Sequence, residues 1–173
     1  MEVIIDGYNL LFVSSNSRAR HEELFENARN RLIEKLSQYK RERNISISIV
    51  FDGWEGGFHA QSQDMVKGIK VIYSKLGEKA DEVIMQIIEN SSKEIIVVSS
   101  DREIRDFAAR HDMVSLSSSE FEKKIELSSY IKMKGSLAKD YDYQEKKFTT
   151  IKKGNPKKLS KSERKRRAKL KRL

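Results

Sequence analysis

Short runs of β-branched residues that stop at an aspartate recur along this chain. Runs of this length and composition are typical of buried strands, and the aspartate that follows marks the end of the strand; after Asp6 and Gly7 we expect a loop. The runs, each with its aspartate, are residues 3–5 with Asp6, residues 45–51 with Asp52, and residues 94–98 with Asp101.

Segments with helical periodicity separate these runs. The apolar residues of segment 22–43 recur at three- and four-residue steps, which predicts an amphipathic helix. Further helices are predicted over 80–89, over 102–110 and from Ser117 onward, further strands over 69–73 and 113–114, and a loop over 53–68. Because strands alternate with helices, we expect an α/β fold with a mostly parallel sheet covered by helices on both faces.

Ligand sites in such sheets lie at the carboxyl ends of the strands, so Asp6, Asp52 and Asp101 should meet at one edge. Asp81 and Glu82 open the helix after segment 69–73 and should join them. Carboxylates this close together repel one another, and a divalent cation relieves the repulsion. Oxygen ligands without His or Cys favour Mg²⁺ or Mn²⁺, which can activate water for attack on a phosphodiester.

Each aspartate also has a purely structural interpretation. Asp101 fits the N-cap of the following helix, and Asp52 with Gly53 fits a turn. Asp81 lies in the first turn of its helix, where an acidic residue suits the helix dipole. These roles do not explain why three strands all stop at Asp, and the joint pattern therefore favours a site.

The positive charge is concentrated in segment 152–173, which has 12 Lys and Arg residues and one acidic residue, a net charge of +11. Residues 1–151 have a net charge of −2. The segment is either a solvated end, disordered or helical, or an arm that binds a polyanion, and its charge favours the arm. Composition alone does not distinguish RNA from DNA. The expected RNA-binding residues are Lys158, Lys161, Arg164, Lys165, Arg166, Arg167, Lys169, Lys171 and Arg172.

We therefore expect three parts: a folded domain over residues 1–133, a polar connecting segment over 134–151 and the basic tail over 152–173. The absence of Cys excludes thiol catalysis and Cys-ligated metal sites. No apolar run is long enough to span a membrane, and the first residues do not resemble a secretory signal, so we expect a cytoplasmic protein without a membrane partner. A P-loop, a dinucleotide-binding glycine motif and a GxSxG elbow are also absent.

The motifs at the strand ends are similar to those of a known family. Ile4-Ile5-Asp6-Gly7-Tyr8-Asn9, Val50-Phe51-Asp52-Gly53, Lys79-Ala80-Asp81-Glu82 and Val98-Ser99-Ser100-Asp101 resemble, in order and spacing, the YacP-like NYN ribonucleases, a branch of the PIN-like nucleases. The resemblance covers roughly residues 2–132. It implies a PIN-like (NYN) three-layer fold around a metal-dependent acidic pocket, with endoribonuclease activity on single-stranded RNA.

The resemblance also implies roles for single residues. Asp6, Asp81 and Asp101 would be catalytic acids that bind Mg²⁺ or Mn²⁺, and Asp52 would join them around the metal. Asn9 would be a catalytic residue that orients a ligand, water or phosphate. Glu82 and Ser100 are candidates for supporting positions behind the ligands.

Aromatic residues near the same edge have two interpretations. Tyr8 could stack on a base or pack under the next helix, and Trp54 and Phe58 in the glycine-rich loop could also stack on bases.

We expect a cytoplasmic, Mg²⁺- or Mn²⁺-dependent endoribonuclease with a basic RNA-binding tail and with the ribosome as a candidate partner. The alternative is a non-catalytic RNA-binding or ribosome-associated factor with the same fold. A receiver-like signalling domain fits less well, because the paired acids and the lysine that it needs are missing.

Overall fold

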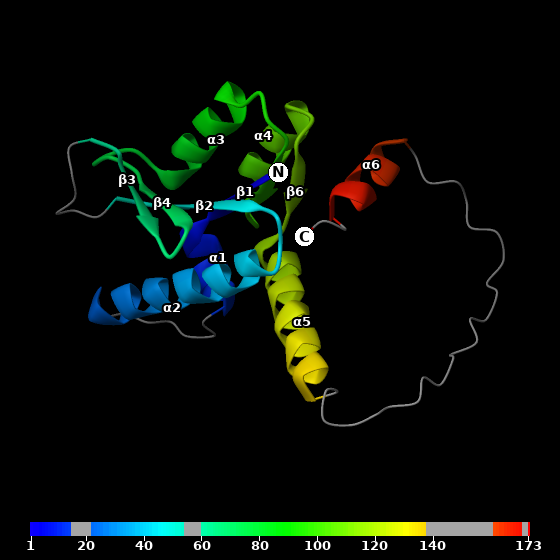
Figure 1. The fold of residues 1–173 in the computed structure, drawn as a ribbon. Coiled ribbons are helices and arrows are strands. Elements are labelled where there is room, and N and C mark those ends of the chain that lie inside the picture. The colour runs from blue at the N-terminus through cyan, green and yellow to red at the C-terminus, as the bar shows by residue number, and fades with distance from the viewer. Residues whose placement is uncertain (15–21, 54–59, 138–160, 171–172) are drawn as a thin grey trace.

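A six-stranded sheet forms the centre of the molecule (Figure 1), and its strands lie in the order β3-β4-β2-β1-β5-β6. The computed structural model of the chain describes residues 1–14, 22–53, 60–137, 161–170 and 173. All neighbouring strands are parallel except β3 and β4, which confirms the predicted α/β class and the mostly parallel sheet. The strands are β1 (Glu2–Asp6), β2 (Ser46–Phe51), β3 (Ser62–Val66), β4 (Ile69–Tyr73), β5 (Ile95–Val98) and β6 (Val114–Leu116).

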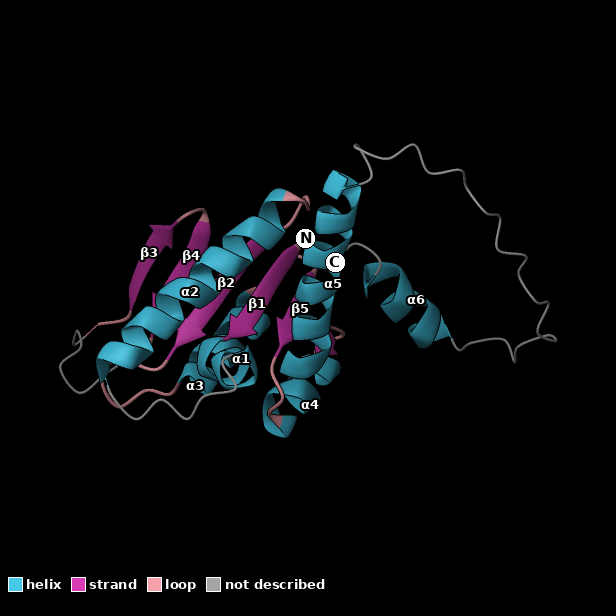
Figure 2. Cartoon of the chain, turned by 90° about the horizontal axis from the view of Figure 1, so that it is seen from below, coloured by secondary structure: helices cyan, strands magenta, loops and turns pink. Residues whose placement is uncertain are grey.

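Helices cover both faces of the sheet, as the strand–helix alternation predicts (Figure 2). One face carries α1 (Gly7–Ser14), α2 (Glu22–Arg41) and α5 (Ser118–Leu137), and the other carries α3 (Ala80–Asn90) and α4 (Arg102–Arg110). Each layer has its own apolar core against the sheet. The strands β2 and β5 are therefore buried along almost their whole length, as parallel strands covered on both sides are.

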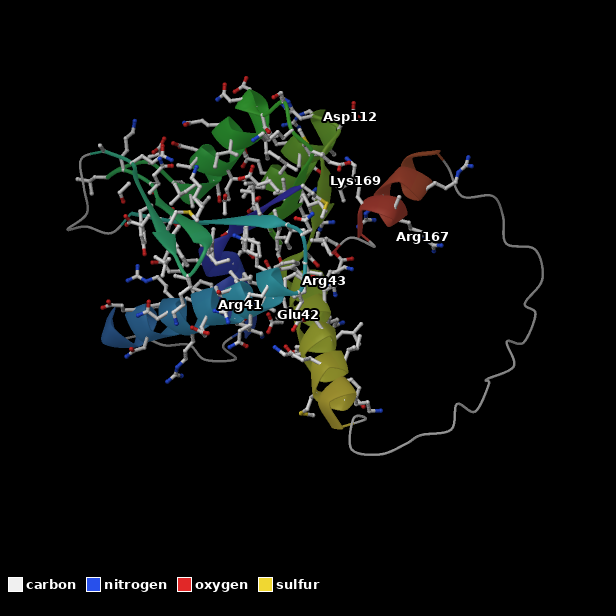
Figure 3. All side chains as sticks on the ribbon, in the orientation of Figure 1. Arg41, Glu42, Arg43, Asp112, Arg167 and Lys169 are labelled. Atoms are coloured by element: carbon white, nitrogen blue, oxygen red, sulfur yellow. The ribbon has the colours of Figure 1, made fainter. Side chains whose placement is uncertain are left out.

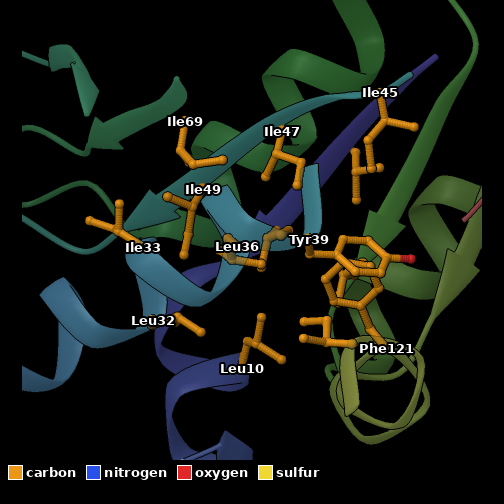
Figure 4. Packing of buried hydrophobic residues seen from close by; sticks show 14 of the residues in the cluster. Leu10, Leu32, Ile33, Leu36, Tyr39, Ile45, Ile47, Ile49, Ile69 and Phe121 are labelled. Carbon is orange, nitrogen blue, oxygen red and sulfur yellow. The ribbon is translucent and has the colours of Figure 1, made fainter. Parts of the chain in front are cut away.

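The core under α2 shows why that segment is a helix (Figure 4). Leu32, Leu36 and Tyr39 follow one another at four- and three-residue steps, and all are buried against the sheet. The Tyr39 ring meets the Phe121 ring of α5 edge-on, with centroids 5.6 Å apart. Full burial of such a side chain stabilises the fold by about 1.5–3 kcal/mol. These buried contacts place α2 and α5 on the same face of the sheet.

The predicted loop over residues 53–68 is wrong for its second half, which forms β3. This strand pairs antiparallel with β4 through a two-residue turn at Lys67 and Gly68, with φ values of 51° and 81°. Positive φ at both central residues is typical of a tight hairpin turn. None of the side chains of β3 is buried, so the sequence has no apolar alternation that could reveal the strand.

Helix α1 replaces the loop that the sequence predicts after Asp6. The helix begins directly at Gly7, where a Cβ would lie 2.4 Å from the Phe51 ring and 2.7 Å from the Val50 carbonyl oxygen. The glycine therefore allows the chain to turn from β1 into α1 directly against β2.

The basic tail contains the helix α6 (Lys161–Leu170), which lies beside the β6 end of the sheet in Figure 1. Lys169 is 3.2 Å from Glu94, and the Tyr39 hydroxyl donates a hydrogen bond to the Leu173 carbonyl oxygen. Leu173 is only 3% exposed and belongs to the core under α2 and α5. The last residue of the tail is thus packed in the core, so the tail is not a solvated end throughout. None of the helices that the structure describes has an apolar stretch long enough to cross a bilayer.

Candidate active site

Asp6 is the centre of the candidate site. It ends β1, the strand between β2 and β5, and its side chain is 6% exposed. Its Oδ1 accepts a hydrogen bond from the backbone N–H of Asn9 (3.1 Å), as the N-cap of a helix does. Its Oδ2 accepts from the Asn9 side-chain amide (3.0 Å) and from the Ser99 hydroxyl (3.0 Å). Burial nevertheless raises the pKa of this carboxyl, which the three donors counteract only in part.

Ser99 is the residue that links the two central strand ends. It is fully buried, donates to Asp6, and accepts a hydrogen bond from the backbone N–H of Asp101 (3.0 Å). The motif resemblance gave Ser100, not Ser99, as the candidate for a supporting position behind the ligands. The Ser100 hydroxyl, however, accepts a hydrogen bond from the backbone N–H of Ser118 and so contacts the start of α5. The strand register would have identified the right serine: Ile5 lies opposite Val98, so the residues that follow are neighbours.

Asp101 is the N-cap of α4, the structural role that the sequence offered as an alternative. Its Oδ1 accepts hydrogen bonds from the backbone N–H groups of Glu103 (2.7 Å) and Ile104 (3.3 Å). Capping occupies one of the two carboxylate oxygens. The residue still lies close enough to Asp81 for its charge to raise the pKa of that carboxyl.

Asp52 caps a helix that lies far from it in sequence. Its Oδ1 accepts a hydrogen bond from the backbone N–H of Ala80, 2.7 Å away, at the start of α3. Lys79, the local N-cap residue, makes no capping hydrogen bond with its side chain. The strand end of β2 therefore fixes the first turn of α3, and with it the position of Asp81.

Asp81 shows that the four aspartates form one electrostatic cluster. Its pKa is raised above the ordinary value by burial first, and then by the negative charges of Asp6, Asp101 and Asp52. Asp52 likewise raises the pKa of Asp6. We call Asp6, Asp52, Asp81 and Asp101 the acidic edge. The structure thus brings together the four aspartates that the sequence pattern placed at this edge.

The other expected site residues divide into two groups. Asn9 is in the site, since both its backbone and its side chain hydrogen bond to Asp6. Glu82 is exposed on α3, and as a neighbour of Asp81 it points about 100° away around the helix. Tyr8 packs, because its ring meets those of Phe51 and Phe25 edge-on at 5.3 and 6.3 Å. Trp54 and Phe58 lie outside the described residues.

The donor chemistry of the acidic edge suits a divalent cation, because all of its charged groups are carboxylates. Burial is the main cause of the raised pKa of Asp6 and of Asp81, and neighbouring negative charges raise both further. The geometry is less complete. Among the residues that the structure describes, no three His, Cys, Asp or Glu side chains are placed together as ligands of one ion. The edge therefore fits an ion held by one or two carboxylates, which is the usual protein contribution to a Mg²⁺ site, and not a centre built of three direct protein ligands.

The cations of the basic tail are not equivalent. Arg164, Arg166 and Arg167 are exposed on α6, whereas Lys169 is 7% exposed and paired with Glu94. The side chains of Lys161 and Lys165, and the residues Lys158, Lys171 and Arg172, lie outside the part that the structure describes.

Comparisons with known proteins agree with this architecture. A curated relative from Bacillus subtilis (strain 168), described as uncharacterized protein YacP, is 29% identical over 111 residues. The match spans 57% of this chain and 59% of the relative's length. Two crystal structures of Rae1 (YacP) from Bacillus subtilis, one of them of a mutant, share the fold. The mutant structure has a TM-score of 0.63 at 22% identity, covering 84% of this chain and 86% of that one. The other has a TM-score of 0.60 at 23% identity, covering 81% and 83%.

The family model of the YacP-like NYN domain matches residues 3–172. This range is longer than the 2–132 that the motifs suggest, and it includes the basic tail, which the motifs alone leave outside the family pattern. The central motifs, the fold and the full-length match lead to one conclusion: the chain belongs to the YacP-like NYN domain family.

Proposed function

We propose that this protein is an endoribonuclease that hydrolyses single-stranded RNA at the acidic edge with the help of Mg²⁺ or Mn²⁺. The observation that carries the proposal is the gathering of four aspartates at the carboxyl ends of the central strands, where burial first, and then the charges of Asp6, Asp101 and Asp52, raise the pKa of Asp81. Four carboxylates at one edge of a sheet are unfavourable for the fold alone, and a cation offsets their repulsion. Membership of the NYN family is consistent with a nuclease.

The cation, when bound, would supply an activated water and would stabilise charge on the phosphodiester. Asp81 and Asp101 are the best candidates to hold it, since Asp6 already accepts three hydrogen bonds. Hydrogen bonds within the protein fix the positions of these carboxylates. Asn9 and Ser99 hold the Asp6 carboxylate, and Asp52 holds the first turn of α3 through Ala80.

RNA is the proposed substrate because the tail concentrates positive charge on a chain whose remainder is nearly neutral. Such an arm also suits docking on ribosomal RNA, so we include the ribosome as a candidate partner in the cytoplasm. The second candidate function is an RNA-binding factor without catalysis. One observation favours it: the carboxylates of Asp6, Asp52 and Asp101 all hold structural hydrogen bonds, a role that does not need a metal.

The test is cleavage of an end-labelled single-stranded RNA by the purified chain with Mn²⁺ or Mg²⁺, with and without EDTA and with and without ribosomes. Asp81→Asn is the informative variant, and Glu89→Gln on the exposed part of the same helix is its matched control. We expect cleavage by the wild type and by the control only when a cation is present. Equal Mn²⁺ binding by wild type and Asp81→Asn in a titration, together with no cleavage by either, would favour the non-catalytic factor.

A further inference from the structure

A groove with a volume of about 700 Å³ runs between α4, β6 and α6. It lies along the free edge of β6, the last strand of the sheet. We call it the α4–α6 groove. Among its lining residues are Arg102, Arg105, Ala109, Ser115, Arg166 and Lys169.

The groove has cations on both walls. Arg102 and Arg105 lie three residues apart on α4 and so share a helix face, and Arg166 faces them from α6. The Arg105 Nε is buried and has no hydrogen-bond partner among the described residues. The contact of Arg102 with Asp106 is long (3.5 Å), and the Arg102 side chain is 95% exposed, so this ion pair is weak. Arg102 and Arg105 therefore both have donors left for an additional anionic partner, which would have to compete with the carboxylates of Asp106 and Asp112 in the same lining.

Lys169 has a different role from these arginines. It is nearly buried against Glu94 and so attaches α6 to the body, with Asp112 across the groove (Figure 3). Arg167 belongs to another surface, where it lies near Arg43, Lys124 and Leu173. Within α6, Arg166 is thus the described arginine that faces the groove.

The groove leads toward the acidic edge. Arg102 directly follows Asp101, so the α4 wall begins at the candidate site. Arg166 and Arg105 both help to lower the pKa of Glu120, after the larger effects of the Ser117 hydrogen bonds, and Glu120 lies in the first turn of α5. Both arginines therefore lie within electrostatic range of the first turn of α5, which follows the carboxyl end of β6.

We propose that the α4–α6 groove binds the phosphate backbone of a single RNA strand and guides it to the acidic edge, with Arg105 and Arg166 as the main phosphate ligands. This inference rests on the proposed function. The acidic edge itself repels a polyanion, so affinity for RNA must come from cations beside it. Arginine suits this role because its planar guanidinium can donate two parallel hydrogen bonds to one phosphate.

The test is the salt dependence of RNA binding, measured by fluorescence anisotropy with a labelled oligouridylate in EDTA, which prevents metal-dependent cleavage. The variants are Arg105→Gln and Arg166→Gln. Their controls remove the same charge outside the groove lining and outside the tail: Arg110→Gln on α4 and Arg41→Gln at the exposed end of α2. Each groove variant should flatten the log–log slope by about 0.7 for every phosphate that it no longer neutralises. The controls should keep slopes close to that of the wild type.

Groove variants whose slopes flatten no more than those of their controls would overturn the proposal. Arg102→Gln is the second variant if Arg105→Gln does not fold, because the Arg102 side chain is almost fully exposed. Displacement of the RNA by polyglutamate at equal charge concentration would show a general anion site and would also overturn it. Cleavage in Mn²⁺ is measured in parallel. A wild type that binds with the expected slopes but does not cut would reject the nuclease function and leave the groove assignment standing.

Discussion

The acidic edge and the α4–α6 groove are neighbouring surfaces that differ in the sign of their charge and in how their charged side chains are held. The acidic edge is built at the ends of central strands, and its carboxylates are held by hydrogen bonds from Asn9, Ser99 and Ala80. The groove lies at the rim of the sheet, and its arginines have few partners. A rigid anionic centre suits chemistry on a phosphodiester, whereas adaptable cations suit binding of a chain of phosphates. The comparison predicts that substitutions in the two regions affect different measurements.

The largest effect is expected from Asp81→Asn in the acidic edge. The substitution removes a charge that the cation needs, so turnover should fall by at least about 10²-fold, the scale seen when a single charge-stabilising group is removed. The measurement is single-turnover cleavage of saturating RNA in Mn²⁺. The salt slope of RNA binding should remain that of the wild type. Near-normal turnover of Asp81→Asn would remove the carboxylate from the mechanism.

Truncation after Ile151 removes the α6 side of the groove together with all of the tail charge. Affinity for RNA should fall steeply and the salt slope should flatten, because the shortened chain neutralises several fewer phosphates, each of which accounts for about 0.7 of the slope. A saturating short RNA should still be cut, which a parallel cleavage assay checks. Loss of cutting at saturation would place the tail in the active site.

The same truncation should also lower the melting temperature, because Leu173 is buried in the core beside Tyr39. Leu173→Ala in the full chain is the control that keeps all charges. It should destabilise the fold by about 2–5 kcal/mol, the range for large-to-small substitutions in a core. An unchanged melting temperature in both chains would show that the tail does not pack on the body.

Ser99→Ala separates the two strand-end serines. The Ser99 hydroxyl is buried between Asp6 and Asp101, and its removal leaves the Asp101 N–H without its acceptor, so we expect a decrease of about 1–3 kcal/mol in the free energy of unfolding. Ser100→Ala is the matched control and should cost less, because Ser100 is exposed. Chemical denaturation of both variants gives the comparison. Equal decreases would contradict the linking role of Ser99.

The smallest effect is on the pH dependence of stability. Since the pKa of Asp81 is raised in the folded chain, the folded state binds this proton more tightly than the unfolded state does. This carboxyl therefore destabilises the fold as pH rises from its ordinary pKa through the raised one, and the destabilisation is complete above that interval. Asp81→Asn should melt higher than the wild type at neutral pH, by a few degrees, and the difference should shrink in acid.

Cation addition gives the complementary measurement. Mg²⁺ or Mn²⁺ should raise the melting temperature of the wild type at neutral pH, since a ligand that binds only the folded state stabilises it. The same addition should not shift Asp81→Asn. Identical shifts in the two chains would locate the cation away from the acidic edge.

Much of the architecture could be predicted from the sequence. The β-branched runs that form β1, β2, β4 and β5, and the helical periodicity of α2 and α3, are local signals of burial, and the structure confirms them. In a mostly parallel sheet, which the strand–helix alternation predicts, the carboxyl ends of neighbouring strands lie at the same edge. The meeting of Asp6, Asp52 and Asp101 could therefore be predicted without knowledge of any side-chain contact.

Tertiary structure alone decided the rest. Strand β3 has no buried side chain, and only its pairing with β4 makes it a strand. The choice of Ser99 over Ser100 depends on strand register, and the positions of Arg166 and Leu173 depend on how α6 packs beside β6. The local hydrophobic pattern of a sequence indicates whether a residue is buried, but it does not indicate which distant residue will contact it. For this reason the sequence determined the buried strands and the acidic edge, whereas strand β3, the hydrogen-bond partners of that edge and the basic groove beside it arose only from the folded chain.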